Sequence, residues 1–116
     1  MTPEEIIQYC LSKQYVTEET PFGPDTAVYK VCGKMFLLIG LDDPTSVNVK
    51  CNPEKAIEWR EQYEEVQPGF HMNKTHWNTV SIVGRLSNRL IKEMIDLSYN
   101  EVVAGLPKKV RLSLFC

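Results

Sequence analysis

The sequence predicts an α+β fold in which an antiparallel sheet carries its helices on one face, a two-layer sandwich. Strand-like segments follow one another with short connections, which favours antiparallel pairing. Helical segments with one apolar stripe stand before, between and after them, and such stripes must be buried against a sheet. The predicted order is helix, three strands, helix, one or two strands, helix, in a single domain of residues 1–116.

The first predicted helix begins at Thr2, a favourable N-cap, with Pro3 at the first helical position. Apolar residues then recur at helical spacing, and the pattern fades near Gln14. Residues 20–25 read TPFGPD, and the two prolines make this segment a rigid turn. We expect Phe22, at its centre, to close one edge of the core.

Three strands should follow this turn. Residues 27–32 and 35–39 are rich in β-branched and aromatic side chains, and the Gly33-Lys34 pair between them signals a hairpin. Both segments are apolar at nearly every position, which predicts that this hairpin lies in the middle of the sheet. In residues 47–51, valine and cysteine alternate with polar side chains, which predicts a strand with one solvent-exposed face.

The second predicted helix begins after Asn52, its N-cap, with Pro53 in the first position. Its glutamates form a solvated acidic side, and its apolar residues should face the sheet. Residues 77–83 form the next strand, in which Asn78 shares a face with Val80 and Ile82.

A long final helix is predicted after Ser87, its N-cap, and we expect Gly105 to end it as a left-handed cap. The tail KKVRLSLF is a candidate edge strand. The inward faces of all these elements should meet in one core. Its expected members are Ile6, Leu11, Val28, Leu37, Val49, Ile57, Val80, Leu90 and Met94.

Composition points to an ordinary globular protein, with 43% hydrophobic and 24% charged residues. A membrane span needs about 20 consecutive apolar residues, and none is present, so we expect no membrane partner. The N-terminal residues are acidic where a signal peptide would be basic, which predicts a cytoplasmic protein. The absence of CxxC spacing predicts reduced thiols at Cys10, Cys32, Cys51 and Cys116.

Charge is unevenly distributed along the chain. Residues 1–65 hold 6 basic and 12 acidic side chains, whereas residues 66–116 hold 7 basic and 3 acidic ones. This asymmetry indicates either an acidic and a basic face or two halves whose charges are mixed by folding.

Residues 68–80, PGFHMNKTHWNTV, gather both histidines, a tryptophan, two asparagines and a lysine. A basic side chain beside an aromatic one suits phosphate binding and base stacking. The alternative for Trp77 is that it packs inside, at the start of a strand. The candidate nucleic-acid-binding residues are His71, Asn73, Lys74, His76, Trp77, Asn78, Lys108 and Lys109.

Spacing alone assigns no chemistry to the histidines. His71 and His76 lie five positions apart, and no neighbouring residues supply the remaining ligands of a zinc site. We expect no metal and no cofactor, and we expect both histidines to hold an irregular loop through hydrogen bonds to the backbone. A cysteine–histidine nucleophilic pair stays open, because spacing cannot test it; the leading expectation is that the protein is not an enzyme.

Several blocks of the chain resemble the MmcQ/YjbR family of small bacterial proteins. They are PFG at 21–23, VYKVCGKMF at 28–36, VKCNP at 49–53, the stretch at 68–80, and LSYNEVV and LPKK near the C-terminus. The resemblance implies a two-layer α+β fold with an antiparallel sheet, likened to the CyaY and secretion-chaperone folds. Members of the family are commonly labelled DNA-binding.

The leading functional expectation is therefore a small cytoplasmic binding module, a weak DNA binder that uses the surface of residues 71–78 and the tail at 106–111. The alternative is a protein-interaction or chaperone-like adaptor that uses the acidic second helix or an open sheet face. A sequence pI near 5.7 argues against strong duplex binding. A continuous basic patch would favour nucleic acid, and an exposed apolar patch would favour a protein partner.

Overall fold

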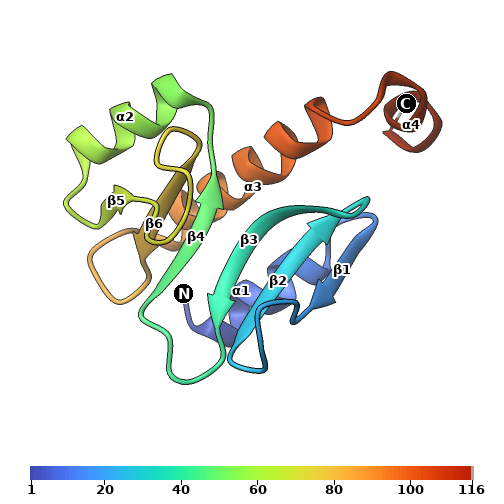
Figure 1. The fold of residues 1–116 in the computed structure, drawn as a ribbon. Coiled ribbons are helices and arrows are strands. Elements are labelled where there is room, and N and C mark those ends of the chain that lie inside the picture. Colours follow the sequence, from blue (N-terminus) through green and yellow to red (C-terminus); the bar gives the residue numbers. More distant parts are fainter. Residues whose placement is uncertain (116) are drawn as a thin grey trace.

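The computed structural model describes residues 1–115 and confirms the α+β fold, with a six-stranded antiparallel sheet and four helices (Figure 1). The strands lie in the order β1-β2-β3-β4-β6-β5. The strands are β1 (Val16–Glu19), β2 (Thr26–Val31), β3 (Lys34–Gly40), β4 (Ser46–Lys50), β5 (Val66–Pro68) and β6 (Trp77–Ser81). The helices are α1 (Pro3–Leu11), α2 (Pro53–Gln62), α3 (Asn88–Ala104) and α4 (Lys108–Phe115).

Side-chain caps place the helices where the sequence predicts them. Thr2 and Glu5 form a reciprocal capping box at the start of α1. Asn52 accepts a hydrogen bond from the Lys55 backbone at the start of α2, and Ser87 does the same for Leu90 at the start of α3. These bonds satisfy backbone N–H groups that have no partner within the helix.

The helices α1, α2 and α3 bury their apolar stripes against one face of the sheet, as the two-layer prediction requires. Helix α1 packs against β1, α2 against β5 and β6, and α3 against β2, β3 and β4. Buried residues from all three helices join one core cluster with the inward side chains of the sheet. The helix residues in it are Ile6, Cys10, Ala56, Trp59, Ile91, Met94, Ile95, Tyr99 and Val102.

A bulge in the central hairpin directs an extra aromatic ring into this core. Tyr29 pairs with Leu37, but the next residue of β2, Lys30, pairs with Met35, so Phe36 is the unpaired residue. Phe36 and Leu37 are therefore both buried in the core cluster although they are adjacent in sequence. The Phe36 ring meets Tyr99 of α3 edge to face, with ring centroids 5.4 Å apart.

None of the helices within residues 1–115 covers the opposite face of the sheet, and we call it the bare face (Figure 1). A small second cluster lies there, made of Val28, Leu38 and Trp77 with Met35 and Met72 beside them. Val28 is thus buried as predicted, but outside the main core. The prediction was wrong for two other residues, since Leu11 is 42% and Ile57 52% exposed. Ala56 and Trp59 take the inward positions of α2 instead of Ile57.

Three further details differ from the prediction. The edge strand β1 has no alternation of apolar residues, because only Val16 is half-buried, and so the sequence carries no signal for it. The tail forms helix α4 rather than an edge strand; its Phe115 ring packs near Tyr15 and Tyr99. Gly105 does end α3, but with right-handed backbone at φ −86°.

Within residues 1–115, none of the helices combines the length and the apolar character needed to cross a bilayer.

Candidate functional site

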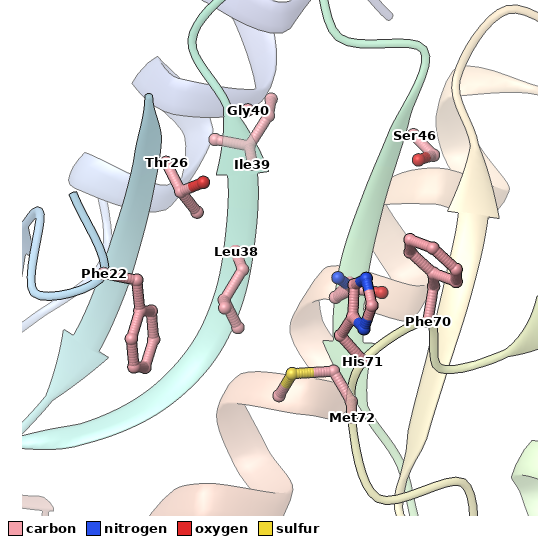
Figure 2. A pocket seen from close by; sticks show the side chains of 10 residues that line it. Phe22, Thr26, Leu38, Ile39, Gly40, Ser46, Phe70, His71 and Met72 are labelled. Atoms are coloured by element: carbon pink, nitrogen blue, oxygen red, sulfur yellow. The ribbon is translucent and has the colours of Figure 1, made fainter. Parts of the chain in front are cut away.

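The bare face contains a hollow of about 430 Å³ that lies between two connections of the chain. Figure 2 shows Phe22, from the β1–β2 connection, on one side, and Phe70, His71 and Met72 on the other, with Leu38 of β3 between them. The lining residues are Phe22, Thr26, Leu38, Ile39, Gly40, Ser46, Asn48, Phe70, His71 and Met72.

The lining of the hollow carries no carboxylate, lysine or arginine. Its polar groups are hydroxyls, one amide and one imidazole, and its largest side chains are two phenyl rings. Phe22 is 65% exposed and Phe70 is 66% exposed. The expectation that Phe22 closes the core edge is wrong: the prolines beside it hold the ring outside the core, where it forms a wall of the hollow.

The second wall belongs to residues 69–76, which we call the wall loop. It begins with a close approach, because the Gly69 N–H donates to the Trp77 carbonyl at 2.8 Å. A Cβ atom at Gly69 would lie 2.8 Å from the Trp77 Cβ and 2.9 Å from the Trp77 carbonyl oxygen. Only glycine fits at this position without a shift of the strand.

Side chains of the wall loop also hold its shape. The Lys74 Nζ donates to the Gly69 carbonyl at 3.0 Å and so closes the loop on itself. The Asn73 Oδ1 accepts from the backbone N–H groups of Thr75 and His76, at 2.9 and 3.3 Å. These bonds explain why lysine and asparagine stand in the motif, and they leave the Lys74 ammonium already engaged.

An arginine on the acidic helix α2 fastens the wall loop to the rest of the protein. The Arg60 Nε donates to Asn78 Oδ1 at 2.6 Å, and its Nη2 donates to the carbonyls of Lys74 and Trp77. Asn78 is buried, and its Nδ2 donates to the Ala56 carbonyl at 3.3 Å. The planar guanidinium suits this forked arrangement.

A hydrogen-bonded path also joins the floor of the hollow to the wall loop. The Thr79 Oγ1 donates to Asn48 Oδ1 at 2.5 Å and accepts from the Phe70 N–H at 2.9 Å. Phe70 therefore stands on a backbone that is bonded to the sheet. Its ring lies against His71, with centroids 4.0 Å apart and planes at 50°. His71 adopts φ +59°, the left-handed region in which non-glycine residues are uncommon.

The structure separates the residues predicted to bind nucleic acid. Trp77 is packed in the small cluster of the bare face, as the alternative interpretation proposed, and Asn78 is buried on the helix side of β6. Only His71 among the eight lines the hollow. Lys108 and Lys109 are exposed on α4, which lies at the far end of α3 from β5 and β6 (Figure 1).

The histidines do not hold the loop through their side chains, because neither imidazole makes a hydrogen bond within residues 1–115; Asn73, Lys74 and Arg60 do so instead. His76 contributes its backbone carbonyl, which accepts from the Cys51 N–H at 2.7 Å. Over the same residues, no three His, Cys, Asp or Glu side chains come together as metal ligands.

The buried cysteines have the character of core residues. Burial raises the pKa of Cys10 to about 12, and burial together with Glu101 raises the pKa of Cys51 to about 11. Both thiols stay protonated at neutral pH, whereas a nucleophile needs the thiolate form. Cys10, Cys32 and Cys51 are free, and Cys116 lies outside the described residues.

The sequence reasoning missed Phe22, Phe70 and Arg60. Phe70 lies within the motif, but hydrogen-bonding potential points to the polar residues around it as the binding residues. Phe22 carries a usable signal, a large apolar side chain in a rigid proline turn, which has little room to fold inward. Arg60 has no such signal, because its partners lie 14 to 18 positions away in the sequence.

Comparisons with known proteins agree with the fold and with the motifs. A family model described as YjbR matches residues 11–101. The chain is 39% identical over 90 residues to YbdF of Escherichia coli O157:H7, covering 77% of this chain and 74% of that one. It is 32% identical over 112 residues to YjbR of Escherichia coli strain K12, covering 96% and 95%.

Solved structures show the same architecture at similar levels of identity. The Deinococcus radiodurans protein DR2400, a DUF419 domain, matches with a TM-score of 0.88 and 31% identity, over 97% of this chain and 86% of that one. A Pseudomonas syringae protein matches with a TM-score of 0.74 and 28% identity, over 87% and 98%. The sequence blocks, the family model and the shared fold together show that this chain belongs to the YjbR family.

Proposed function

We propose that this protein is a non-enzymatic binding module that takes an apolar or aromatic side chain of a protein partner into the hollow on its bare face. One observation carries the proposal: the two phenyl rings of Phe22 and Phe70 face an uncharged hollow and are both about two-thirds exposed. Exposed apolar surface of this kind marks interaction sites, and buried aromatic anchors dominate the binding energy of protein interfaces.

The build of the hollow supports a binding role. Its floor is a sheet, and its second wall is bonded to that sheet through Thr79 and to α2 through Arg60. A wall held in this way loses little conformational freedom when a ligand enters, which favours affinity. The free thiols of Cys10, Cys32 and Cys51 support the further proposal that the protein works in the reducing cytoplasm.

The test is an NMR titration of the uniformly ¹⁵N-labelled protein with N-acetyl-phenylalaninamide as a probe. We expect amide shifts at Phe22, Leu38, Asn48 and Phe70, and we expect the double variant Phe22→Ala/Phe70→Ala to lose them. The matched control is Val83→Ala/Leu112→Ala, which removes two other exposed apolar side chains, 69% and 50% exposed. Shifts that survive the double phenylalanine variant, or shifts confined to another surface, would contradict the proposal.

A second candidate is single-stranded nucleic acid, and the contact between the exposed rings of Phe70 and His71 favours it, since such rings stack on bases. The lysines of the protein that could contact phosphates are dispersed. Lys74 is bonded to Gly69, and Lys108 and Lys109 belong to α4. We therefore expect at most micromolar, salt-sensitive affinity, in the range of non-specific binding at about 10⁻⁴–10⁻⁶ M.

Fluorescence anisotropy of a labelled oligonucleotide at low and moderate salt measures this affinity. The variant Lys108→Glu/Lys109→Glu tests the contribution of α4, and Phe70→Ala tests stacking. If the oligonucleotide binds through the hollow, Phe70→Ala weakens it and the α4 variant has the smaller effect. If the parent protein does not bind at low salt, the nucleic-acid candidate fails.

A further inference from the structure

Three aspartates lie in the connections just beyond one end of the hollow. Two lining residues of the hollow, Thr26 and Gly40, lie beside each other at this end in Figure 2 and are the last paired residues of β2 and β3 there. Asp25 directly precedes Thr26, and Asp42 and Asp43 follow Gly40 after one residue. The Leu41 N–H donates to the Asp25 carbonyl at 2.8 Å, so the two acidic connections are bonded to each other.

The three carboxylates at this end are not neutralised. Asp25, Asp42 and Asp43 are all exposed, and in the part of the chain that the structure describes none of them forms an ion pair or a side-chain hydrogen bond. Three like charges in the connections beyond Thr26 and Gly40 raise the local concentration of cations at this end of the sheet and repel anions.

The lysines of the bare face and its wall loop are Lys30, Lys50 and Lys74. Lys30 of β2 shares the bare face with its strand partner Met35, and its ammonium is paired with Glu19 at 3.2 Å. Lys50 ends β4, whose first residue, Ser46, lines the hollow, and the four residue steps between them correspond to about 13 Å of strand. A separation of about 13 Å exceeds the Debye length of about 8 Å at physiological salt, and the Lys74 ammonium is engaged by the Gly69 carbonyl. These lysines therefore do not neutralise the three aspartates.

From this arrangement we infer that the partner segment is cationic as well as apolar: a peptide with a phenylalanine or large aliphatic side chain next to lysine or arginine. The inference rests on the proposed function and deepens it. The apolar side chain enters between Phe22 and the wall loop, and the neighbouring basic side chains meet Asp25, Asp42 and Asp43. The same charges disfavour a nucleic acid at this end, because they repel its phosphates.

Three capped synthetic peptides test the inference by NMR titration: KKFFKK, its acidic counterpart EEFFEE, and KKGGKK, which lacks the aromatic anchor. At low salt we expect KKFFKK to bind about tenfold more tightly than EEFFEE, as expected for a few exposed charge pairs. The difference should shrink in 0.5 M salt, which we choose because screening there is strong. KKGGKK should bind much more weakly than KKFFKK.

The variant Asp25→Asn/Asp42→Asn/Asp43→Asn should bring the affinities for KKFFKK and EEFFEE close together. The control variant Glu54→Gln/Glu58→Gln/Glu61→Gln makes the same change in net charge on the exposed side of α2, and it should leave the preference intact. Spectra of all variants also report whether they are folded.

The outcomes distinguish failure of the cationic partner from failure of the proposed function. If KKFFKK and EEFFEE bind equally and both lose affinity in Phe22→Ala/Phe70→Ala, the cationic partner is excluded while the proposed function stands. If KKGGKK binds as well as KKFFKK, or no peptide binds, the proposed function fails and the inference with it. If an oligonucleotide shifts the hollow amides and displaces KKFFKK, the partner is a nucleic acid and the inference is overturned.

Discussion

The Arg60 Nε lies 2.6 Å from the Asn78 Oδ1, so a side chain of the exposed acidic helix is bonded to a buried amide of strand β6. The same guanidinium reaches the carbonyls of Lys74 and Trp77, where the wall loop joins the strand. The wall of the hollow thus depends on a residue that lies outside the hollow and outside the motif. Its removal should affect both stability and loop order.

We predict that Arg60→Ala lowers the free energy of unfolding by about 1–3 kcal/mol, because it leaves the buried Asn78 oxygen without its donor. Asn78→Ala should cost a similar amount, and the double variant should cost less than the sum of the two. Urea denaturation measures all three. Arg60→Lys should recover little of the stability that Arg60→Ala loses, because an ammonium lacks the planar, forked donors of a guanidinium.

The control for this cycle is Glu61→Ala, an exposed residue of the same helix, which should change the free energy of unfolding by less than about 0.5 kcal/mol. Additive effects of Arg60→Ala and Asn78→Ala would show that the two residues are not coupled as the 2.6 Å contact requires.

Two glycine substitutions should have opposite effects. Gly69→Ala places a Cβ 2.8 Å from the Trp77 Cβ, and we expect it to destabilise the protein by about 1–3 kcal/mol. Gly105→Ala meets nothing closer than 3.5 Å and has a right-handed backbone, so it should be neutral or stabilise by up to about 1 kcal/mol. Thermal unfolding of both variants measures the two effects. A Gly69→Ala variant as stable as the parent would contradict the close approach of Gly69 to Trp77.

The capping box of α1 predicts a pH dependence of stability. Hydrogen bonds from the Thr2 backbone and side chain lower the pKa of Glu5 from its usual 4.5. A lowered pKa in the folded state means that the carboxylate stabilises the protein above the carboxyl range, and that this contribution is lost as the pH falls through the lowered pKa. Stability should therefore decline on the acid side.

The variant Glu5→Gln should show a flatter decline than the parent between about pH 5 and pH 3. Glu4→Gln is the matched control, because Glu4 is a neighbouring exposed carboxylate that forms no hydrogen bond within residues 1–115. Urea midpoints across this pH range provide the measurement. Identical pH profiles for the parent and Glu5→Gln would refute the prediction.

The thiols should react in an order set by burial. In a Cys116→Ser background at pH 8, we expect a thiol reagent to modify the half-buried Cys32 first. Cys10 and Cys51 should react slowly, because burial raises their pKa values to about 12 and 11 and little thiolate is present. Mass spectrometry of the labelled peptides establishes the order.

Full reaction of the parent chain in denaturant without reductant should yield four thiols per chain. A yield of two or none would overturn the expectation of reduced cysteines. Fast labelling of Cys10 in the folded protein would contradict its place in the core.

The sequence by itself determined the features that depend on near neighbours. Thr2, Asn52 and Ser87 cap helices because their side chains reach backbone N–H groups three positions away. The turn at Gly33 forms because glycine tolerates the left-handed backbone observed there, at φ +81°. The polar face of β4 follows from the alternation of successive side chains between the two faces of a strand.

Only the tertiary structure decided the site. Phe22 and Phe70 stand 48 positions apart, and no periodicity relates them; strand order brings their connections to the two sides of one hollow. The same holds for Arg60, whose partners belong to another element. The tail forms helix α4, and its Phe115 ring meets Tyr15 and Tyr99, residues 100 and 16 positions away, which local sequence cannot indicate.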